Sequence, residues 1–415
     1  MNRALVLTAL IALLGSPVAT PVAAGTAKLE RVVMLMRHGI RPPTKAEPVP
    51  AGFSDKPWPE WPVKPGLLTP RGAAGVTLLG NGDRAYWISK GLLPAEGCPA
   101  GAVTAAASAK QRALRTAESY VAALMPGCDI PVEHPAPDGD DPVFHTLEGV
   151  PATFDGHAAF LDAQKMLPKG GLATELRAYR AELVLLQRAL GCCAPILCDA
   201  AKQPAACPIS SLPSVLIENR NDRPNLEGPL GIGSTASQTF LLEYLEGMPM
   251  ADVAWGRATR ADIEKMLRFH PVKFRYENRP EYIARRAGSA LAARLVAALA
   301  APAGASKVAL FAGHDTNLAD VASLFGLHWK VPSYPTDDIP PGSALGFELW
   351  TDAHGGVSVR AFFRAQTMDQ LRNQVPLDAT TQPFRQYLSI PGCGSAPCPL
   401  AKFQGIAAAR IIRIN

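Results

Sequence analysis

The sequence predicts a doubly wound α/β fold with a mostly parallel sheet and an inserted, mainly helical region. Residues 29–36 and 308–312 are short apolar runs that end abruptly at polar residues, as buried strands do. Residues 316–325 follow the second run and space their apolar side chains for one face of a helix. Strand–loop–helix units of this kind favour a parallel sheet with helices on its faces.

The two expected strands both end at a histidine. The run 29–36 leads into Arg37, His38 and Gly39, and the run 308–312 leads into Gly313 and His314. Ligands of doubly wound sheets bind beyond the carboxyl ends of the strands. The sequence therefore predicts that both histidines lie at one ligand-binding edge.

The middle of the chain has a different pattern, and a helical insertion explains it best. We expect the α/β domain to be discontinuous, formed by residues 25–150 and 286–415, with a mainly helical cap at 151–285. The segments with helical patterns are 160–190, 236–246, 261–268 and 279–300.

The first residues have the pattern of a secretory signal peptide. Arg3 precedes an apolar run at 4–14, and small residues end the segment at Ala23 and Ala24. A retained anchor is the alternative, but a membrane-spanning helix needs about 20 apolar residues. We expect residues 1–24 to be removed and the mature protein to be periplasmic or secreted, with no membrane contact afterwards.

Composition excludes few function classes but indicates a globular protein. Hydrophobic residues make up 48% of the chain and charged residues 19%. The formal net charge is +5, or +4 once Arg3 is removed with the signal segment. Such a mild charge does not suggest a nucleic-acid partner, and it is compatible with a small anionic substrate.

The cysteines indicate disulfides. Eight cysteines in an exported chain favour a disulfide framework, although the sequence alone leaves many pairings open. Close spacing favours Cys198 with Cys207 and Cys393 with Cys398. Zinc is the alternative, but no C-x-x-C or H-E-x-x-H motif occurs. The adjacent Cys192 and Cys193 remain unassigned.

The residues around the two histidines suit phosphoryl chemistry. Arg37 and Arg41 flank His38, and arginine forks match phosphate oxygens. A neutral imidazole between them could attack phosphorus. His314 could add a phosphate donor and Asp315 an acid for the leaving group. We expect a bound phosphate, as a like charge, to raise the pKa of Asp315.

The motifs resemble those of a known family. Residues 37–42, Arg-His-Gly-Ile-Arg-Pro, resemble the R-H-G-x-R-x-P signature of histidine acid phosphatases, branch 2 of the histidine phosphatase superfamily. Residues 313–317 resemble the C-terminal H-D motif of that family. The sequence is most similar to the bacterial periplasmic phytase and glucose-1-phosphatase group, over essentially the whole mature chain. Further segments that resemble this group are 58–63, 68–72, 141–144, 255–257 and 370–399.

The resemblance implies a phosphoglycerate-mutase-like fold and a role for each matching residue. His38 matches the nucleophile that forms phosphohistidine, and Asp315 matches the proton donor. The phosphate-binding set is Arg37, Arg41, Arg112 and His314. The residues expected on the substrate side are Thr44, Lys45 and Gln238, the last of which stands where the phytase branch has Glu.

The family also implies disulfides and a substrate class. The implied bridges are Cys98 with Cys128, Cys198 with Cys207, and Cys393 with Cys398. We expect a monomeric acid phosphatase that hydrolyses phosphomonoesters, with phytate as the first candidate substrate, and no metal or cofactor. The alternatives are a glucose-1-phosphatase, a broad sugar-phosphate phosphatase, a mutase, or a non-catalytic phospho-sugar binding protein.

Overall fold

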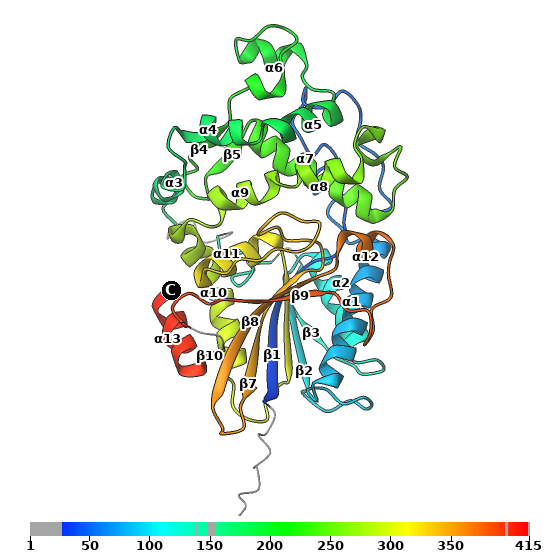
Figure 1. The fold of residues 1–415 in the computed structure, drawn as a ribbon, viewed down its shortest axis with the longest axis vertical. Coiled ribbons are helices and arrows are strands. Elements are labelled where there is room, and N and C mark those ends of the chain that lie inside the picture. Colours follow the sequence, from blue (N-terminus) through cyan, green and yellow to red (C-terminus); the bar gives the residue numbers. More distant parts are fainter. Residues whose placement is uncertain (1–26, 138, 148–153, 395–396, 414–415) are drawn as a thin grey trace, which may run out of the picture.

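The computed structural model describes residues 27–137, 139–147, 154–394 and 397–413. The expected signal peptide, residues 1–24, lies outside the described residues. Figure 1 shows a sheet flanked by helices at one end of the molecule and a helical region at the other.

One large sheet organises the α/β end. Its strands lie in the order β10-β8-β7-β1-β6-β2-β3, and β9 also pairs with β8. The neighbours β1, β6, β2 and β3 are parallel, whereas β7, β8, β9 and β10 pair antiparallel. The bounds are β1 (Lys28–Arg37), β2 (Val103–Ala107), β3 (Val132–Glu133), β6 (Val308–Gly313), β7 (Ala344–Thr351), β8 (Val357–Ala365), β9 (Phe384–Leu388) and β10 (Cys398–Pro399).

The expected α/β class is confirmed. Strand β1 covers the expected run 29–36, and β6 covers the run 308–312. The two strands are direct parallel neighbours. The antiparallel side of the sheet was not predicted from the sequence.

Helices cover both faces of the sheet. Side chains alternate along β1, so Val33 and Leu35 join one core cluster while Val32 and Met34 join the other. The first cluster includes helices α10 (Glu281–Leu299) and α11 (Asp315–Phe325), and the second includes α1 (Pro70–Ser89) and α2 (Gln111–Leu124). The C-terminal elements α12 (Met368–Arg372) and α13 (Leu400–Arg410) complete this end.

The region between the halves of the α/β fold is mainly helical, as expected. The expected helix at 160–190 is divided, because Pro168 and Gly170, with a φ of 92°, interrupt it. The elements are α3 (Gly156–Gln164), α4 (Gly171–Ala178), α5 (Arg180–Leu190), α6 (Pro195–Ala200), η2 (Ile209–Ser211), β4 (Val215–Ile217), β5 (Asn225–Glu227), α7 (Pro229–Glu246), η3 (Val253–Gly256), α8 (Arg260–Met266) and α9 (Phe269–Glu277).

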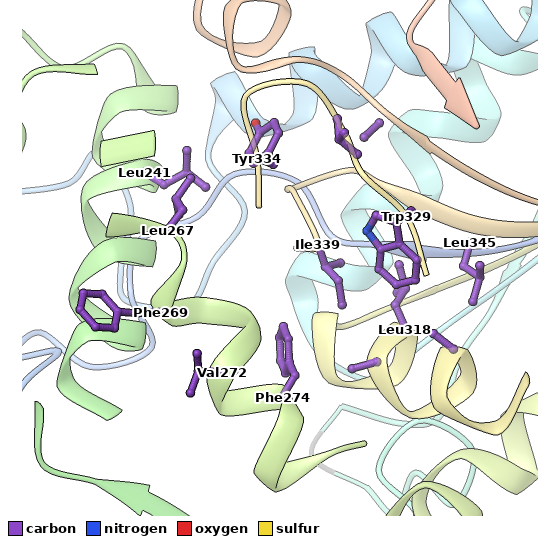
Figure 2. Packing of buried hydrophobic residues seen from close by; sticks show 14 of the residues in the cluster. Leu241, Leu267, Phe269, Val272, Phe274, Leu318, Trp329, Tyr334, Ile339 and Leu345 are labelled. Atoms are coloured by element: carbon purple, nitrogen blue, oxygen red, sulfur yellow. The ribbon is translucent and has the colours of Figure 1, made fainter. Parts of the chain in front are cut away.

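The helical region shares its core with the α/β end. Figure 2 shows Leu241 and Phe269 of the helical region in the same cluster as Leu318 and Leu345 of the α/β end. This continuous apolar contact fixes the helical region relative to the sheet edge. The division into a cap at 151–285 and a discontinuous α/β domain stays a prediction.

The cysteines of the structure are paired. The bridges include the three implied ones, Cys98 with Cys128, Cys198 with Cys207, and Cys393 with Cys398. The fourth joins Cys192 to Cys193, which the sequence left unassigned. Across the part of the chain that the structure describes, no helix is both long and apolar enough to cross a membrane.

Candidate active site

Three strand ends meet where the sequence predicts ligand binding. The backbone N–H of His38, just after β1, donates to the carbonyl of Gly313 at the end of β6 (3.0 Å). The N–H of Ser108, just after β2, donates to the carbonyl of Ala312 (2.9 Å). The parallel register thus brings His38, Ser108 and the residue after Gly313, His314, to one edge of the sheet.

Gly39 is required by the packing of helix α1. A Cβ atom at this position would lie 2.8 Å from the carbonyl oxygen of Gly72, near the start of α1. Its own N–H donates to Thr116 Oγ1 on α2 (3.0 Å). The glycine of the motif therefore lets the loop after β1 pass close to two helices, which holds His38 in place.

The hydrogen bonds of His38 determine which of its two ring nitrogens carries the hydrogen. Its Nδ1 lies 2.8 Å from the carbonyl oxygen of Gly39. A carbonyl only accepts, so Nδ1 carries the hydrogen and Nε2 keeps its lone pair. Arg41 Nε donates a hydrogen bond to this Nε2 lone pair (3.4 Å). The side chain is thus oriented with an unprotonated nitrogen next to a cation.

The surroundings of His38 keep it neutral. Burial is the main reason that its pKa lies well below the ordinary value, and the charges of Arg41 and Arg112 lower it further. A neutral imidazole is the form that can act as a nucleophile. The positive charges that favour this form are also suited to receive a phosphoryl group.

Arg37 is buried, and its guanidinium has three polar partners. Its guanidinium pairs with Asp315 Oδ2 at 2.8 Å and donates to the carbonyl of Ile339. Gln238 Oε1 on α7 lies 3.4 and 3.3 Å from the two terminal nitrogens. Gln238, expected on the substrate side, therefore contacts Arg37 and links the helical region to the phosphate-binding set.

The positive groups around Asp315, above all its ion-pair partner Arg37, keep its carboxyl ionised. Burial is the largest single influence and raises the pKa of this carboxyl, but the positive charges around it, with Arg37 first and His270 and Arg41 next, together outweigh burial and hold the pKa well below the ordinary value. By itself, the protein therefore has Asp315 ionised. The expected rise in pKa concerns only the complex with a phosphoryl group, whose oxygens would compete for Arg37.

His314 lies at the N-terminus of α11, where the helix presents its positive end. Its backbone N–H donates to Asn317 Oδ1 (2.9 Å), while Asn317 Nδ2 donates to the carbonyl of Phe144 (2.7 Å). Burial, with the charge of Arg112 next in size, holds the pKa of His314 well below its ordinary value. A helix N-terminus stabilises anions, which suits phosphate.

An open cleft joins these groups. Its volume is about 450 Å³. From the expected set it is lined by His38, Arg41, Arg112, His314 and Asp315. The structure therefore brings the expected nucleophile, acid and cations together.

The substrate-side role expected for Thr44 and Lys45 stays a prediction. Thr44 and Lys45 are exposed, and neither lines the cleft of His38. Lys45 instead lines a second hollow of about 340 Å³, together with Trp58 and Trp61. Thr44 lies beside Gly66, where an added Cβ atom would be 3.8 Å from Thr44 and 3.9 Å from Arg112 Nη1, so this loop borders a residue of the His38 cleft.

Sequence reasoning missed several residues of the cleft. His145 lines it, and so does the loop of Asn221, Asp222 and Arg223 from the helical region. Ser108 contacts His145 and His314 (3.1 and 3.2 Å). The only sequence signal for His145 was its position directly after 141–144, a segment singled out for its family resemblance.

No metal site accompanies the cleft in the described part of the chain. Within those residues, no group of three or more His, Cys, Asp or Glu side chains is placed to hold a metal ion. The side chains of the expected phosphate-binding set that carry a permanent positive charge are Arg37, Arg41 and Arg112.

The chain is similar to known phosphatases over nearly its whole length. The sequence model of the histidine phosphatase superfamily, branch 2, matches residues 28–154 and 221–364. Phytase AppA of Escherichia coli (strain K12) is 33% identical over 401 residues, which cover 91% of each chain. The glucose-1-phosphatase of Salmonella typhimurium is 29% identical over 398 residues, covering 91% of this chain and 92% of the relative.

Solved structures agree with the sequence comparison. The Hafnia alvei phytase in complex with tartrate has a TM-score of 0.84 and 33% identity, covering 94% of this chain and 98% of the relative. The same phytase in complex with myo-inositol hexakis sulphate has a TM-score of 0.83, with 32% identity and the same coverage. We conclude that the chain belongs to branch 2 of the histidine phosphatase superfamily and is a phosphomonoester hydrolase.

Proposed function

We propose that this enzyme hydrolyses phosphomonoesters through a phosphohistidine on His38, works at acid pH and prefers phytate. The orientation of His38 is the observation that supports this most. Its Nδ1 donates to the carbonyl of Gly39, so Nε2 keeps its lone pair, which accepts from Arg41 Nε and becomes available when Arg41 turns to the phosphoryl group. An imidazole held in this way is a nucleophile and needs no separate base.

In the first step, the phosphoryl group binds among Arg37, Arg41, Arg112 and His314. His38 Nε2 forms a bond to phosphorus while the bond from phosphorus to the ester oxygen breaks. Asp315 gives its proton to the departing oxygen, which leaves as an alcohol. Cations held in place at the phosphoryl oxygens lower the barrier because they are already oriented towards the charge of the transition state.

In the second step, water attacks the phosphohistidine. The ionised Asp315 takes one proton from the water, the new oxygen–phosphorus bond forms, and the bond from phosphorus to His38 breaks. Inorganic phosphate leaves, and His38 returns to its neutral form. One group thus acts first as an acid and then as a base.

The charge on Asp315 explains the proposed acid optimum. The phosphate competes for Arg37 and adds negative charge, so both effects raise the pKa of Asp315 in the complex. The first step requires protonated Asp315, and the rate therefore falls as the pH rises through the pKa of the complex.

Two relatives define the candidate substrates. Of the two relatives, the phytase has the higher identity. The cleft is lined by three arginines, Arg41, Arg112 and Arg223, which suits a substrate with several phosphates. Glucose-1-phosphate is the second candidate, favoured by the similarity to a glucose-1-phosphatase and by Gln238 in contact with Arg37.

A ranking of substrates decides between these candidates. We would measure kcat/KM for phytate, glucose-1-phosphate and an aryl phosphate at pH 5, on the same preparation. The proposal predicts the highest value for phytate. A higher value for glucose-1-phosphate would replace phytate as the substrate, and binding of these esters without turnover would indicate a binding protein.

We also propose that the enzyme is exported as a monomer, with residues 1–24 as its signal peptide. The disulfides support export, since such bridges persist in oxidising compartments. N-terminal sequencing of the mature protein and its mass in solution test both points. An N-terminus near Gly25 and a monomer mass are expected, whereas a retained leader or a dimer would contradict them.

A further inference from the structure

One arginine of the cleft comes from the helical region and takes no part in the two proposed chemical steps. Arg223 lies in the loop between β4 and β5, and it lines the same cleft as Asn221 and Asp222. Its guanidinium is held by Asp320 on α11, with Nη1 donating to Oδ1 (3.1 Å) and Nη2 donating to Oδ2 (3.0 Å). The cleft thus contains a fixed cation in addition to those around His38.

The position of Asp320 on α11 shows which part of the cleft Arg223 faces. Thr316, at the start of the helix, lines the cleft. Asp320 follows four residues later, so it lies on the same face of the helix and one turn further on. It is also six residues beyond His314, which corresponds to about 9 Å along the helix axis. Arg223 is therefore placed further along the cleft than the groups proposed to hold the reacting phosphoryl group.

The carboxylate behind Arg223 is buried and has partners on both oxygens. The side chain of Asp320 is 1% exposed, and its Oδ1 also accepts a hydrogen bond from Asn278 Nδ2 (2.9 Å). A bidentate pair with a buried partner fixes the plane of the guanidinium before any ligand arrives. A ligand that binds Arg223 therefore loses little affinity to the ordering of this side chain.

Arg223 keeps hydrogen-bond donors for a ligand. A guanidinium has five N–H groups, and among the described residues two of them are taken up, both by Asp320. The side chain of Arg223 is 21% exposed, so the accessible member of the pair is the arginine. Burial by itself lowers the pKa of Arg223, but the carboxylates around it, Asp320 first, together raise it above the ordinary value. The group therefore stays cationic.

Asp222 supplies the opposite charge in the same loop. It is exposed and lines the cleft, and its Oδ1 accepts a hydrogen bond from the backbone N–H of Arg223 (2.7 Å). An anionic group at Arg223 would be repelled by Asp222, but water and salt screen an exposed charge more than a partly buried one. The two neighbouring side chains therefore make opposite contributions to the binding of an anion.

The backbone on both sides of this loop is held by contacts that do not involve the Arg223 side chain. The carbonyl of Arg220 accepts a hydrogen bond from the N–H of Gly156, at the start of α3 (3.1 Å). The N–H of Leu226, on β5, donates to Glu277 Oε1 (2.8 Å). A change of side chain at Arg223 therefore leaves the loop with anchors on either side.

We propose that Arg223 is a specificity-determining residue that binds a second, non-reacting phosphate of the substrate. This rests on the proposed function, in which the reacting phosphate is bound at His38 and phytate is preferred. The substrate class is a small polyol with several phosphate esters, one of which lies at His38 and another at Arg223. The guanidinium fork matches the oxygens of a phosphate. A substrate with one phosphate leaves Arg223 unoccupied, so Arg223 adds nothing to its binding.

The test uses variants that change the charge of the loop with little change in shape. Arg223→Gln is combined with Asp320→Asn, because this double variant leaves no unpaired buried carboxylate. Asp222→Asn removes the opposing charge at an exposed position. The control is Arg188→Gln, which changes an arginine of the helical region that is 54% exposed, pairs with Asp262 and does not line the cleft.

Two pairs of measurements separate the second phosphate from the first. One pair is kcat/KM for phytate and for an aryl phosphate at pH 5. The other is the inhibition constant of myo-inositol hexakis sulphate, which is bound in a solved phytase structure, and that of inorganic phosphate. Within each pair, only the first compound has a second anionic group, so a loss common to both members reports on the fold and not on Arg223.

We expect the double variant to lower kcat/KM for phytate about tenfold and to weaken inhibition by the hexasulphate about tenfold. The values for the aryl phosphate and for inorganic phosphate should change by less than about twofold. Asp222→Asn should improve both phytate hydrolysis and hexasulphate inhibition by about twofold, because an exposed charge contributes less. The control should match the wild type.

An equal loss on both members of a pair, or no loss on phytate and the hexasulphate, would overturn the inference, since Arg223 would then only hold the loop. Weaker hexasulphate inhibition in Asp222→Asn would also overturn it, because the two charges would not act in opposite directions. If the double variant failed to fold, judged by its melting temperature, this sign would decide the inference by itself. If the wild type did not hydrolyse phytate, the proposed substrate would fail, and hexasulphate inhibition would still decide the role of Arg223.

Discussion

The two ends of the molecule contribute different things to the cleft. The α/β end supplies the groups proposed to act on phosphorus, His38, Arg41, Arg112, His314 and Asp315. The helical region supplies Gln238 behind Arg37 and the loop with Asp222 and Arg223. The groups proposed to act on phosphorus therefore lie at the ends of strands, whereas another part of the same cleft is lined by a loop from a different region of the chain.

The links between the two ends also differ in kind. Within the α/β end, the buried Asp83 pairs with Arg364 (2.8 Å) and Arg385 (3.0 Å), which joins α1 to β8 and β9. Between the ends, Arg223 forms a bidentate pair with Asp320 of α11, at 3.1 and 3.0 Å. The loop is thus anchored to the helix that begins beside His314.

The largest expected effect concerns the α/β end. His38→Ala should lower kcat by about 10⁴-fold or more, because no other group in the proposed mechanism attacks phosphorus. The melting temperature should remain close to that of the wild type. Steady-state rates on an aryl phosphate measure the loss, with His157→Ala as the control. Retained turnover would remove His38 from the centre of the mechanism.

Asp315→Asn should have the next largest effect. Hydrolysis of alkyl or inositol phosphates should slow by about 10²–10⁴-fold, because these leaving groups need a proton. Aryl phosphates have better leaving groups and should lose less. Comparing both substrate types on one preparation tests this, and an equal loss on both would mean that the proton comes from another donor.

Arg223→Ala tests the link between the ends. Asp320 would keep its bond from Asn278 but lose its charged partner, so we expect the free energy of unfolding to fall by about 3 kcal/mol. Chemical denaturation measures this. Adding Asp320→Asn to the variant should recover part of the loss, because it removes the unpaired buried charge. No recovery would show that Arg223 acts through packing alone.

The smallest expected effect is on the free energy of unfolding, and it concerns Glu243, a buried residue of the helical region. Burial raises the pKa of Glu243 on α7 to about 8, from an ordinary value of 4.5. The folded state favours the neutral carboxyl, so its contribution to stability declines as the pH rises from about 4.5 to about 8. Glu243→Gln keeps an acceptor for the Ala254 N–H and should reduce this decline.

Denaturation at both ends of that pH range measures the effect of Glu243→Gln. The variant should be more stable than the wild type by about 2 kcal/mol at pH 8, with little difference at pH 4.5. A difference that does not change with pH would show that the ionisation of Glu243 does not govern this part of the stability.

The α/β end could be predicted in large part from the sequence, because its signals are local. Strands β1 and β6 are continuous apolar runs, and each ends directly at its polar motif. The antiparallel strand β7 was missed because nearly all of its residues are buried, so no alternation of polar and apolar residues marks it.

The contributions of the helical region depend on contacts between distant residues and could not be predicted in the same way. Arg223 reaches the cleft because it pairs with a carboxylate 97 positions away in the chain. Gln238 was expected near the substrate, but its contact with Arg37 follows from the packing of α7. Lys45 was expected on the substrate side; it lines a second hollow with Trp58 and Trp61, and its expected role stays a prediction.

The central claim is that phosphate passes through His38, and trapping of the intermediate tests it most directly. The enzyme would be mixed with a labelled phosphomonoester, quenched within one turnover and digested at alkaline pH, where phosphohistidine survives. Mass spectrometry would then locate the phosphate. We predict label on the peptide of His38, in the wild type and in Asp315→Asn but not in His38→Ala. Label on a serine or aspartate, or full turnover with none on the protein, would contradict the account.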